Sequence, residues 1–243
     1  MLTWTRSILD FIFPRYCCIC GEFMRKDHFN YLCETCAQRI ILTGENICAK
    51  CGHDFGEITA QTQRLCPRCL RSEFQFTALR SAVRLNYVTR RLIHQLKYRQ
   101  GKYLTEDFAK IMQKNVSFIA LLKGSIVIPV PLHWRRTFKR EYNQSEIIAK
   151  SLQKLPINVE ILPLLKRIRH TPPQVGLRTH ERRENVKNAF TINPKIGIDR
   201  DRKLVVFDDV FTTGATINEC CKVLQNHGFR NIYAATFTQT SRN

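Results

Sequence analysis

The sequence lacks any long apolar run. No stretch of its 243 residues approaches the roughly 20 consecutive apolar residues of a membrane-spanning helix. The apolar run from Ile8 to Phe13 is too short for a signal peptide, and it contains Asp10. These absences predict a soluble, cytoplasmic protein with no membrane span.

Acidic residues are also scarce, and the resulting basic excess is uneven along the chain. There are 39 lysines and arginines against 20 aspartates and glutamates, which gives a formal net charge of +19. Residues 1–79 hold 9 basic and 8 acidic side chains, whereas residues 80–243 hold 30 and 12. A domain with such an excess favours a polyanionic partner.

One segment of the basic region has the composition of a single-strand-binding surface. Basic side chains interleaved with aromatic rings follow a nucleic-acid backbone and stack its bases. The residues that we expect to contact single-stranded DNA are Trp134, Arg135, Arg136, Lys139 and Arg140. A solvated basic face without a partner is the alternative interpretation.

Two common phosphate-binding motifs are missing as well. A Walker loop ends in Gly-Lys-Ser/Thr and a Rossmann fingerprint has three spaced glycines, whereas the loop at residues 208–216 has one glycine and no lysine. An apolar run precedes this loop and predicts a strand over 203–207. Apolar residues at helical spacing follow it and predict a helix over 215–227. The loop therefore joins a strand end to a helix start.

The composition of this loop suits a phosphorylated sugar. Unpaired N–H groups at a helix N-terminus carry partial positive charge, so Thr212 to Thr216 can cradle a phosphate. Asp208 and Asp209 would then face ribose hydroxyls. The predicted ligand contacts are Asp208, Asp209, Val210, Thr212, Thr213, Gly214, Ala215 and Thr216. The alternative is an ordinary turn whose acids favour the helix dipole and whose threonines cap the helix.

Eight of the eleven cysteines form four C-x2-C pairs. Zinc prefers four thiolates in a tetrahedron, and a two-residue gap lets one tight turn supply two of them. Neighbouring pairs predict two zinc sites, one from Cys17, Cys20, Cys33 and Cys36 and the other from Cys48, Cys51, Cys66 and Cys69. An interleaved arrangement and the use of Cys18 in place of Cys17 stay open. Disulfides are disfavoured because they belong to secreted chains.

Strands alternate with helices after the last cysteine pair. This order predicts an α/β fold with a doubly wound, mostly parallel sheet, in which ligands lie beyond the carboxyl ends of the strands. The expected domains are a Cys-rich zinc module over 1–78 and the α/β domain over 79–243. We expect strands at 79–87, 125–132, 159–162, 190–192, 204–207 and 232–237, and helices at 1–12, 88–98, 103–113, 143–155 and 215–227. The polar segment 167–188 shows no apolar period and is expected to be a flexible lid.

The apolar strand, the two acids and the Thr-Thr-Gly-x-Thr turn together resemble the phosphoribosyl pyrophosphate (PRPP) loop of type I phosphoribosyltransferases. The resemblance implies that PRPP binds with Mg2+, with Asp208 and Asp209 at the ribose hydroxyls and the threonines at the 5′-phosphate. It implies that pyrophosphate lies at a second turn, on Val130, Leu132, Arg135 and Arg136. A closing lid would add Arg182 or Arg183, so the expected catalytic residues are Asp208, Asp209, Arg182 and Arg183.

The order of motifs along the whole chain resembles the ComF family of competence proteins. After the cysteine pairs, the motifs are 91–98, Pro129-Val130-Pro131-Leu132, Tyr142-Asn143-Gln144, Thr171-Pro172-Pro173-Gln174, Arg183-Glu184-Asn185-Val186 and the PRPP loop. The resemblance implies a cytoplasmic role in the uptake of single-stranded DNA during natural transformation. It also implies a competence helicase or DNA-import protein as a partner. One departure from the family pattern is Phe211, which we expect to leave the phosphate contacts unchanged.

Three functions are compatible with these patterns. The first is a DNA-handling protein of natural transformation with a PRPP site. The second is an active, amidophosphoribosyltransferase-like enzyme with an unknown acceptor, although the sequence declares no acceptor pocket and no N-terminal catalytic cysteine. The third is a protein whose zinc module docks a competence helicase. Nothing in the sequence indicates an oligomeric state.

Overall fold

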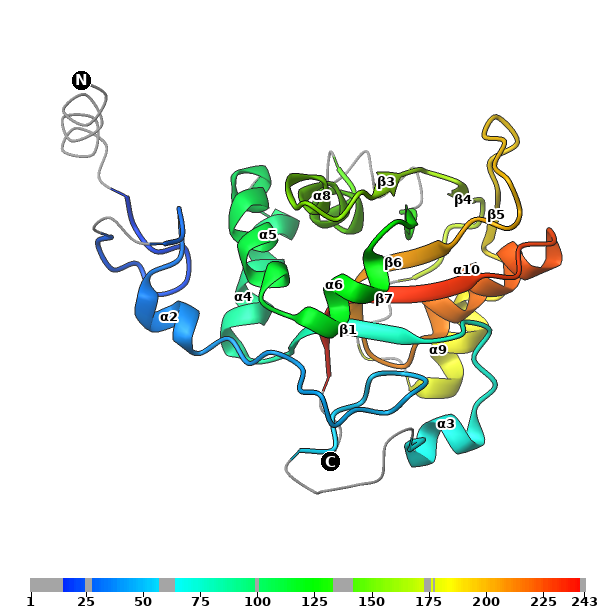
Figure 1. The fold of residues 1–243 in the computed structure, drawn as a ribbon, viewed down its shortest axis with the longest axis horizontal. Coiled ribbons are helices and arrows are strands. Elements are labelled where there is room, and N and C mark those ends of the chain that lie inside the picture. The colour runs from blue at the N-terminus through cyan, green and yellow to red at the C-terminus, as the bar shows by residue number, and fades with distance from the viewer. Residues whose placement is uncertain are drawn as a thin grey trace.

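The computed structural model describes residues 15–24, 28–56, 64–98, 101–132, 142–172, 176 and 178–240. Its centre is a five-stranded sheet in which every recorded pairing is parallel (Figure 1). The strand order is β1-β7-β6-β2-β3. The strands are β1 (Leu79–Arg84), β2 (Ile126–Pro129), β3 (Glu160–Ile161), β6 (Leu204–Phe211) and β7 (Ile232–Gln239). The predicted mixed α/β class with a parallel sheet is confirmed.

The direction of winding reverses between β2 and β6. From β2 the chain moves outward to β3, and from β6 it moves outward to β7 on the opposite side. Parallel sheets of this kind bind ligands beyond the carboxyl ends of the two strands at such a reversal. In this protein those ends are Pro129 of β2 and the Asp208–Phe211 half of β6.

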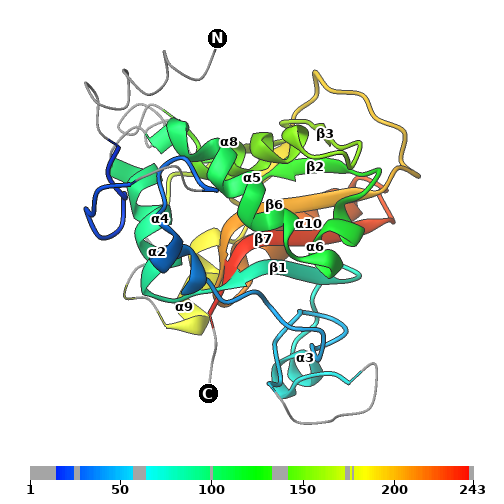
Figure 2. The same cartoon turned by 60° about the vertical axis from the view of Figure 1, so that its left-hand side comes forward.

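Helices cover both faces of the sheet (Figure 2). Successive strand residues point to opposite faces, so Val205 and Phe207 join one hydrophobic core while Leu204 and Val206 join the other. The first core includes residues of α4 (Tyr87–Tyr98), α5 (Thr105–Gln113), α6 (Val116–Leu122) and α8 (Gln144–Ser151), with short 3-10 helices at Gly101–Leu104 and Leu152–Lys154. The second core includes α10 (Ala215–Asn226) and the end of α9 (Thr179–Val186). Because the sheet is buried on both faces, the sequences of its strands are continuous apolar runs.

The expected flexible lid has regular structure in the described residues. Strands β4 (Leu165–Arg167) and β5 (Phe190–Ile192) form a separate antiparallel pair, and α9 lies between them in the chain. The strand predicted at 190–192 therefore exists, but it lies outside the main sheet. Helix α9 has no apolar stripe and buries only Val186; its start is closed by the Glu181 carboxylate, which accepts the Arg178 N–H at 2.6 Å. Periodicity does not detect a helix that is stabilised by capping.

Further differences separate the expected elements from the observed ones, including the unexpected strand β4 and the end of β6 at Phe211 and not at Phe207. Helix α6 was not predicted; it begins after Asn115, whose side chain accepts the Phe118 N–H at 3.0 Å. Tyr87 belongs to α4 and not to the preceding strand, which ends at Arg84. The helix predicted over 1–12 lies outside the described residues. Among the helices that are described, none combines the length and apolar character needed to cross a membrane.

The cysteine-rich region forms two modules on different parts of the core. We call described residues 15–24 and 28–40 the first module, and residues 44–56 and 64–72 the second module. Each contains one short helix, α2 (Glu34–Gln38) or α3 (Pro67–Arg71), and the two helices lie far apart beside the sheet (Figure 1). The first module joins the core that holds α4 and α5, and the second module joins the core that holds α10.

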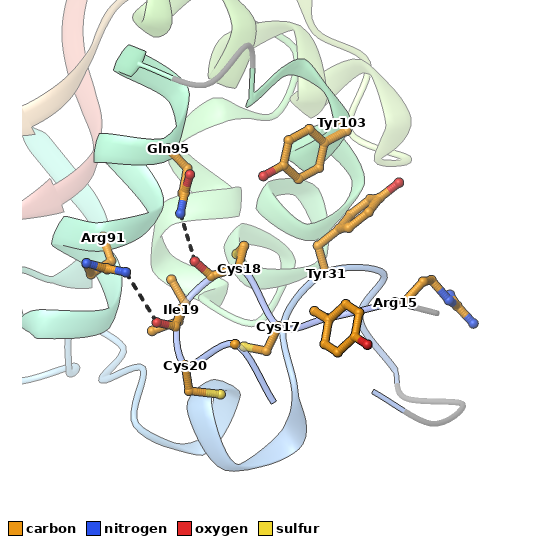
Figure 3. A pocket seen from close by; sticks show the side chains of 11 residues that line it. Arg15, Cys17, Cys18, Ile19, Cys20, Tyr31, Arg91, Gln95 and Tyr103 are labelled. Carbon is orange, nitrogen blue, oxygen red and sulfur yellow. Dashed lines mark hydrogen bonds between the residues drawn. The ribbon is translucent and has the colours of Figure 1, made fainter. Parts of the chain in front are cut away.

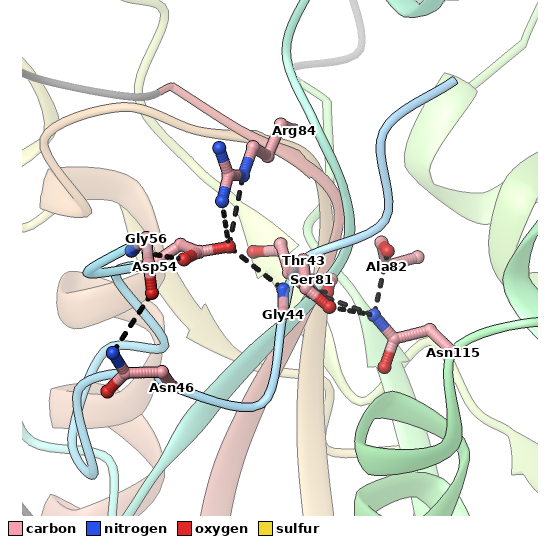
Figure 4. A network of polar contacts seen from close by, with 9 residues as sticks. All are labelled: Thr43, Gly44, Asn46, Asp54, Gly56, Ser81, Ala82, Arg84 and Asn115. Carbon is pink, nitrogen blue, oxygen red and sulfur yellow. Dashed lines mark hydrogen bonds and ion pairs between the residues drawn. The ribbon is translucent and has the colours of Figure 1, made fainter. Parts of the chain in front are cut away.

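The short linker between the modules, residues 41–43, runs beside the edge strand β1. Leu42 pairs antiparallel with Val83, and the Arg84 N–H donates to the Ile41 carbonyl at 2.8 Å. Around this linker lies a polar network (Figure 4) in which the Asn115 amide donates to the Thr43 hydroxyl at 2.8 Å. The linker thus acts as a short extra strand on the outer edge of the sheet.

Candidate metal centres and phosphate-binding loop

The four cysteine pairs come together as two clusters of four sulfurs. Each cluster joins neighbouring pairs, with all of its sulfurs within 4.8 Å of one another: Cys17, Cys20, Cys33 and Cys36, and Cys48, Cys51, Cys66 and Cys69. The sulfurs of Cys20 and Cys33 are 3.7 Å apart, and those of Cys51 and Cys66 are 3.6 Å apart. Four thiolates at about 2.3 Å from a tetrahedral zinc ion lie about 3.8 Å from one another. Both clusters therefore fit structural zinc sites, and the arrangement is not interleaved.

The first cluster uses Cys17 and not Cys18. Burial raises the pKa of Cys18 to about 12, and the charge of Cys17 contributes to this rise. Burial also opposes ionisation of Cys17, but backbone N–H donors from Cys33, Cys20 and Ile19 outweigh it and lower the pKa of Cys17 to about 7. The geometry agrees, because the sulfur of Cys17, and not that of Cys18, belongs to the cluster whose sulfurs all lie within 4.8 Å of one another.

The predicted phosphate loop lies at the carboxyl end of β6. The strand extends to Phe211, so Asp208 and Asp209 belong to it, and Thr212–Gly214 turn the chain into α10. Gly214 has φ +75°, and a Cβ there would lie 2.6 Å from the Phe211 ring. This position therefore requires glycine. The turn leaves the first N–H groups of a 12-residue helix beside the strand end.

Asp208 is held in place from two directions. The Ser145 hydroxyl, on α8, donates to one carboxylate oxygen of Asp208 at 2.8 Å, and the Asp209 N–H donates to the same oxygen at 2.9 Å. Burial, together with the charge of Asp209, raises the pKa of Asp208 to about 7, although these hydrogen bonds act in the opposite direction. Ser145 was not among the predicted site residues, although it follows directly after the Tyr142-Asn143-Gln144 motif.

Two arginines from distant segments contact the loop. Arg182 of α9 donates to the Thr212 hydroxyl at 2.9 Å. Arg183 points elsewhere and donates to the Ser72 hydroxyl at 3.3 Å. Of the two candidate lid arginines, Arg182 is therefore the one that contacts the loop. Arg68 of the second module donates to the Thr212 carbonyl at 2.8 Å and also to the Thr213 carbonyl. Arg68 was not among the predicted site residues, since it is 144 positions from Thr212.

The second predicted turn begins next to this loop. The Val130 N–H donates to the Phe207 carbonyl at 2.8 Å, and the Asn143 amide donates to the Val130 carbonyl at 2.9 Å. Leu132 follows and is half-buried. Two buried polar atoms here, Asn143 Oδ1 and Gln144 Nε2, have no hydrogen-bond partner within the described residues. The remaining residues predicted for this turn and for DNA, Trp134, Arg135, Arg136, Lys139 and Arg140, lie outside the described residues.

A hollow of about 640 Å³ lies between the first module and α4 (Figure 3). Two of its lining residues come from α4: Gln95 donates to the Cys18 carbonyl at 2.8 Å, and Arg91 donates to the Ile19 carbonyl at 3.5 Å. Its wall is aromatic and basic, with Tyr16, Tyr31, Tyr103, Arg15 and Arg91 among the lining residues. This combination of rings and cations also suits the bases and phosphates of a single strand.

The fold and these sites define a class: a parallel α/β protein, consistent with the phosphoribosyltransferase-like fold, with two four-cysteine centres in its N-terminal part. Residues 8–72 match the model of the double zinc ribbon domain. Competence protein F of Haemophilus influenzae is 27% identical over 218 residues, which cover 84% of this chain and 95% of that protein. DNA utilization protein YhgH of Escherichia coli O157:H7 is 28% identical over 220 residues, covering 88% and 92%.

A third relative extends the comparison beyond these two species. Competence protein ComFC of Streptococcus pneumoniae is 21% identical over 232 residues, which cover 89% of this chain and 96% of that protein. The chain is therefore a homologue of the competence protein F, ComFC and YhgH proteins over most of its length. The family resemblance predicted from its motif order is confirmed.

Proposed function

We propose that this protein handles single-stranded DNA in the cytoplasm during natural transformation, and that it binds PRPP at the 208–216 loop. The names of its homologues, which refer to competence and DNA utilization, support the first part. One observation carries the second part: two carboxylates, three threonines and a left-handed glycine meet at a helix N-terminus, at the point where the sheet reverses its winding.

The chemistry of each part of PRPP matches a part of this site. The 5′-phosphate would accept hydrogen bonds from the loop amides and from the hydroxyls of Thr212, Thr213 and Thr216. The carboxylates of Asp208 and Asp209 would accept hydrogen bonds from the ribose hydroxyls. The pyrophosphate would lie on the turn that starts at Val130, with Arg135 and Arg136. Mg2+ would supply charge neutralisation for the diphosphate oxygens.

Calorimetry with PRPP and Mg2+ tests the site on the zinc-loaded full chain. We expect binding by the wild type, and its loss in the double variant Asp208→Asn, Asp209→Asn, because amides cannot replace two anionic acceptors. Asp201→Asn is the matched control, since it neutralises an exposed aspartate in the turn before β6. Binding that survives in the double variant, or that is absent from the wild type, would refute a PRPP site at this loop.

The DNA-binding part is tested separately. The 30 basic side chains of residues 80–243 and the aromatic, basic hollow beside the first module support a single-stranded partner. We expect fluorescence anisotropy with a dT oligonucleotide to give binding that weakens steeply with salt. Joint replacement of Arg135, Arg136, Lys139 and Arg140 by alanine should flatten the salt slope, whereas the same change at the exposed Lys150, Lys154, Lys187 and Lys222 should have a smaller effect. Binding that does not depend on salt would reject this part.

An active phosphoribosyltransferase is the second candidate function, and the contact of Arg182 with Thr212 favours it. This contact joins α9 to the loop. A segment that shields a reactive sugar from water must lie against the loop that binds the sugar. The expected observation is pyrophosphate release from PRPP that Arg182→Ala reduces and Arg183→Ala does not. Equal rates in both variants would dismiss a role for this contact in turnover.

Docking of a helicase or DNA-import protein by the zinc modules is the remaining candidate. Exposed apolar side chains in both modules, including Tyr16, Phe23 and Leu70, favour it. Capture of a purified competence helicase should weaken in the joint variant Tyr16→Ser, Phe23→Ser. Unchanged capture in that variant and in Leu70→Ser would exclude these surfaces as docking sites for the helicase.

A further inference from the structure

The second module reaches the phosphate loop, and we infer that it forms part of the PRPP site. Arg68 is the positioning residue: held between the cluster cysteines Cys66 and Cys69, it orients the backbone amides of the loop toward the phosphate. This inference rests on the proposed function of the loop, and it assigns a role to a residue outside the loop and outside the lid.

The contacts of Arg68 fix its guanidinium tightly. One guanidinium nitrogen donates to the Thr212 carbonyl at 2.8 Å, and the other terminal nitrogen donates to the Thr213 carbonyl. The same guanidinium lies over the rings of Phe74 and Phe211, at 5.1 Å and 4.7 Å from their centroids. A planar, forked donor that packs against two neighbouring rings holds its acceptors in one geometry, which a lysine ammonium cannot do.

The two carbonyl contacts determine where the loop amides point. In a trans peptide the C=O and the following N–H point in opposite directions. Because the Thr212 and Thr213 carbonyls face Arg68, the N–H groups of Thr213 and Gly214 face the other way. No acceptor for either N–H is recorded within the described part of the chain. Two backbone N–H groups that point to the same side before any ligand binds form a preorganised site for phosphate oxygens.

Phe211 takes part in this arrangement. Its ring lies below the Arg68 guanidinium and is the group that a Cβ at position 214 would meet. It therefore packs against both the arginine and the glycine of the loop. Phe211 was expected to leave the phosphate contacts unchanged. Its ring makes no direct contact in the proposed site, but it supports the loop by packing against Arg68 and Gly214.

The second module is in turn fixed to the sheet. The Leu79 N–H donates to the Lys50 carbonyl at 2.7 Å, and Gln239 donates to the Cys51 carbonyl at 3.2 Å. Gly52 packs so closely that a Cβ would lie 2.7 Å from the Leu79 carbonyl oxygen. Arg68 itself lies in α3, a single helical turn that starts at Pro67 and contains the ligand Cys69. A metal ion in this cluster would thus fix the backbone that carries Arg68.

Calorimetry with PRPP and Mg2+ on the zinc-loaded full chain tests this inference. We expect Arg68→Ala to keep two zinc ions per chain and to bind PRPP about 10- to 100-fold more weakly, the range expected for loss of charge-assisted hydrogen bonds. Arg68→Lys should recover only part of the loss, because it lacks the fork. Arg71→Ala removes an exposed arginine from the same short helix and should bind as the wild type does. Wild-type affinity in a zinc-loaded Arg68→Ala protein would overturn the inference.

A second measurement keeps the inference distinct from the proposed function. If the wild type does not bind PRPP, the proposed site fails, but the positioning role is still tested by amide NMR of the ligand-free protein. We expect Arg68→Ala to shift the Thr213 and Gly214 resonances and Arg71→Ala to leave them in place. Unshifted resonances in Arg68→Ala would overturn the positioning role whatever the result with PRPP.

Discussion

The two cysteine modules have the same ligand set but different attachments. The first module is held by helices: the Asp107 carboxylate of α5 accepts the Asn30 and Tyr31 N–H groups, both at 2.8 Å. The second module is held by the sheet, through the backbone of Lys50 and Cys51, and it contacts the loop at residues 212–213. The same set of four cysteines thus occurs in two modules with different surroundings, one attached to the helices and the other attached to the sheet and in contact with residues 212–213.

The clusters also differ in their access to solvent. In the first, Cys20 is exposed and Cys33 is half-buried. In the second, Cys48, Cys51 and Cys66 are buried and Cys69 is half-buried. The module that contacts the loop is therefore the better protected of the two. The C-x2-C spacing therefore predicts the ligand set of each cluster but not the surroundings of the module that holds it.

The largest effect should come from breaking one cluster at a time. Cys48→Ser is expected to lose one zinc ion and to weaken PRPP binding by about 100-fold, because the backbone that carries Arg68 loses its support. Cys33→Ser should also lose one zinc ion but keep PRPP affinity within about threefold. Zinc content by mass spectrometry and calorimetry measure both, with circular dichroism as the control for folding. Equal losses of PRPP affinity in the two variants would show that the second module has no special role at the loop.

A substitution at Asp208 tests the electrostatics of the loop without changing either cysteine module. Because its folded-state pKa is raised to about 7 from 3.8, its contribution to stability is fully present below about pH 4 and is lost as the pH rises to about 7. Asp208→Asn has no proton to lose, so its stability advantage should grow from pH 5 to pH 8. Between pH 5 and pH 8 the upper limit of this growth is about 3 kcal/mol, since only the two pKa units from pH 5 to about 7 contribute, at about 1.4 kcal/mol each. Thermal unfolding at both pH values measures it, and an equal difference at pH 5 and pH 8 would contradict the assignment.

Asp107 provides the matching test for the first module. Asp107→Asn removes an anionic acceptor from two backbone N–H groups in a fully buried place, which should cost about 1–3 kcal/mol of stability. Glu106→Gln is the control, because this neighbouring acid contacts the side chain of the same Asn30 from an exposed position. We expect faster proteolysis within residues 15–40 in Asp107→Asn and not in Glu106→Gln. The PRPP affinity of Asp107→Asn should be unchanged. A loss of PRPP affinity there would show that the first module also supports the loop.

The smallest effect concerns metal release. A chromogenic chelator should withdraw the two zinc ions from the wild type in two phases, the first a few times faster than the second, because Cys20 is exposed to attack. In Cys33→Ser only the slow phase should be left. A single phase in the wild type would mean that the difference in burial does not control access to the metal.

The local parts of the site could be predicted from the sequence, whereas its long-range parts could not. The turn from β6 into α10 was predicted because an apolar run, two acids and a glycine lie within a dozen residues. Helix α9 was missed because a glutamate cap starts it and it has no apolar stripe. Helix α6 was missed because its seven residues are apolar almost throughout, so no polar face marks a helical period.

Arg68 shows why the rest was out of reach. It stands inside a C-x2-C pair, where the spacing already had an explanation in zinc binding, and its partners Thr212 and Thr213 are more than half the chain away. Ser145 was missed for a similar reason, since only the fold brings α8 to the end of β6. No periodicity links such positions, because their contacts arise from the packing of the sheet.

The linker at residues 41–43 has a consequence for association between molecules. An unpaired outer strand offers free N–H and C=O groups that another chain can join, and such edges lead to aggregation. Here the antiparallel bridge from Leu42 to Val83 occupies that edge of β1. Because the linker joins the two modules, we expect that release of the first module would loosen its pairing with β1, so that loss of zinc would favour self-association of the protein as well as local unfolding.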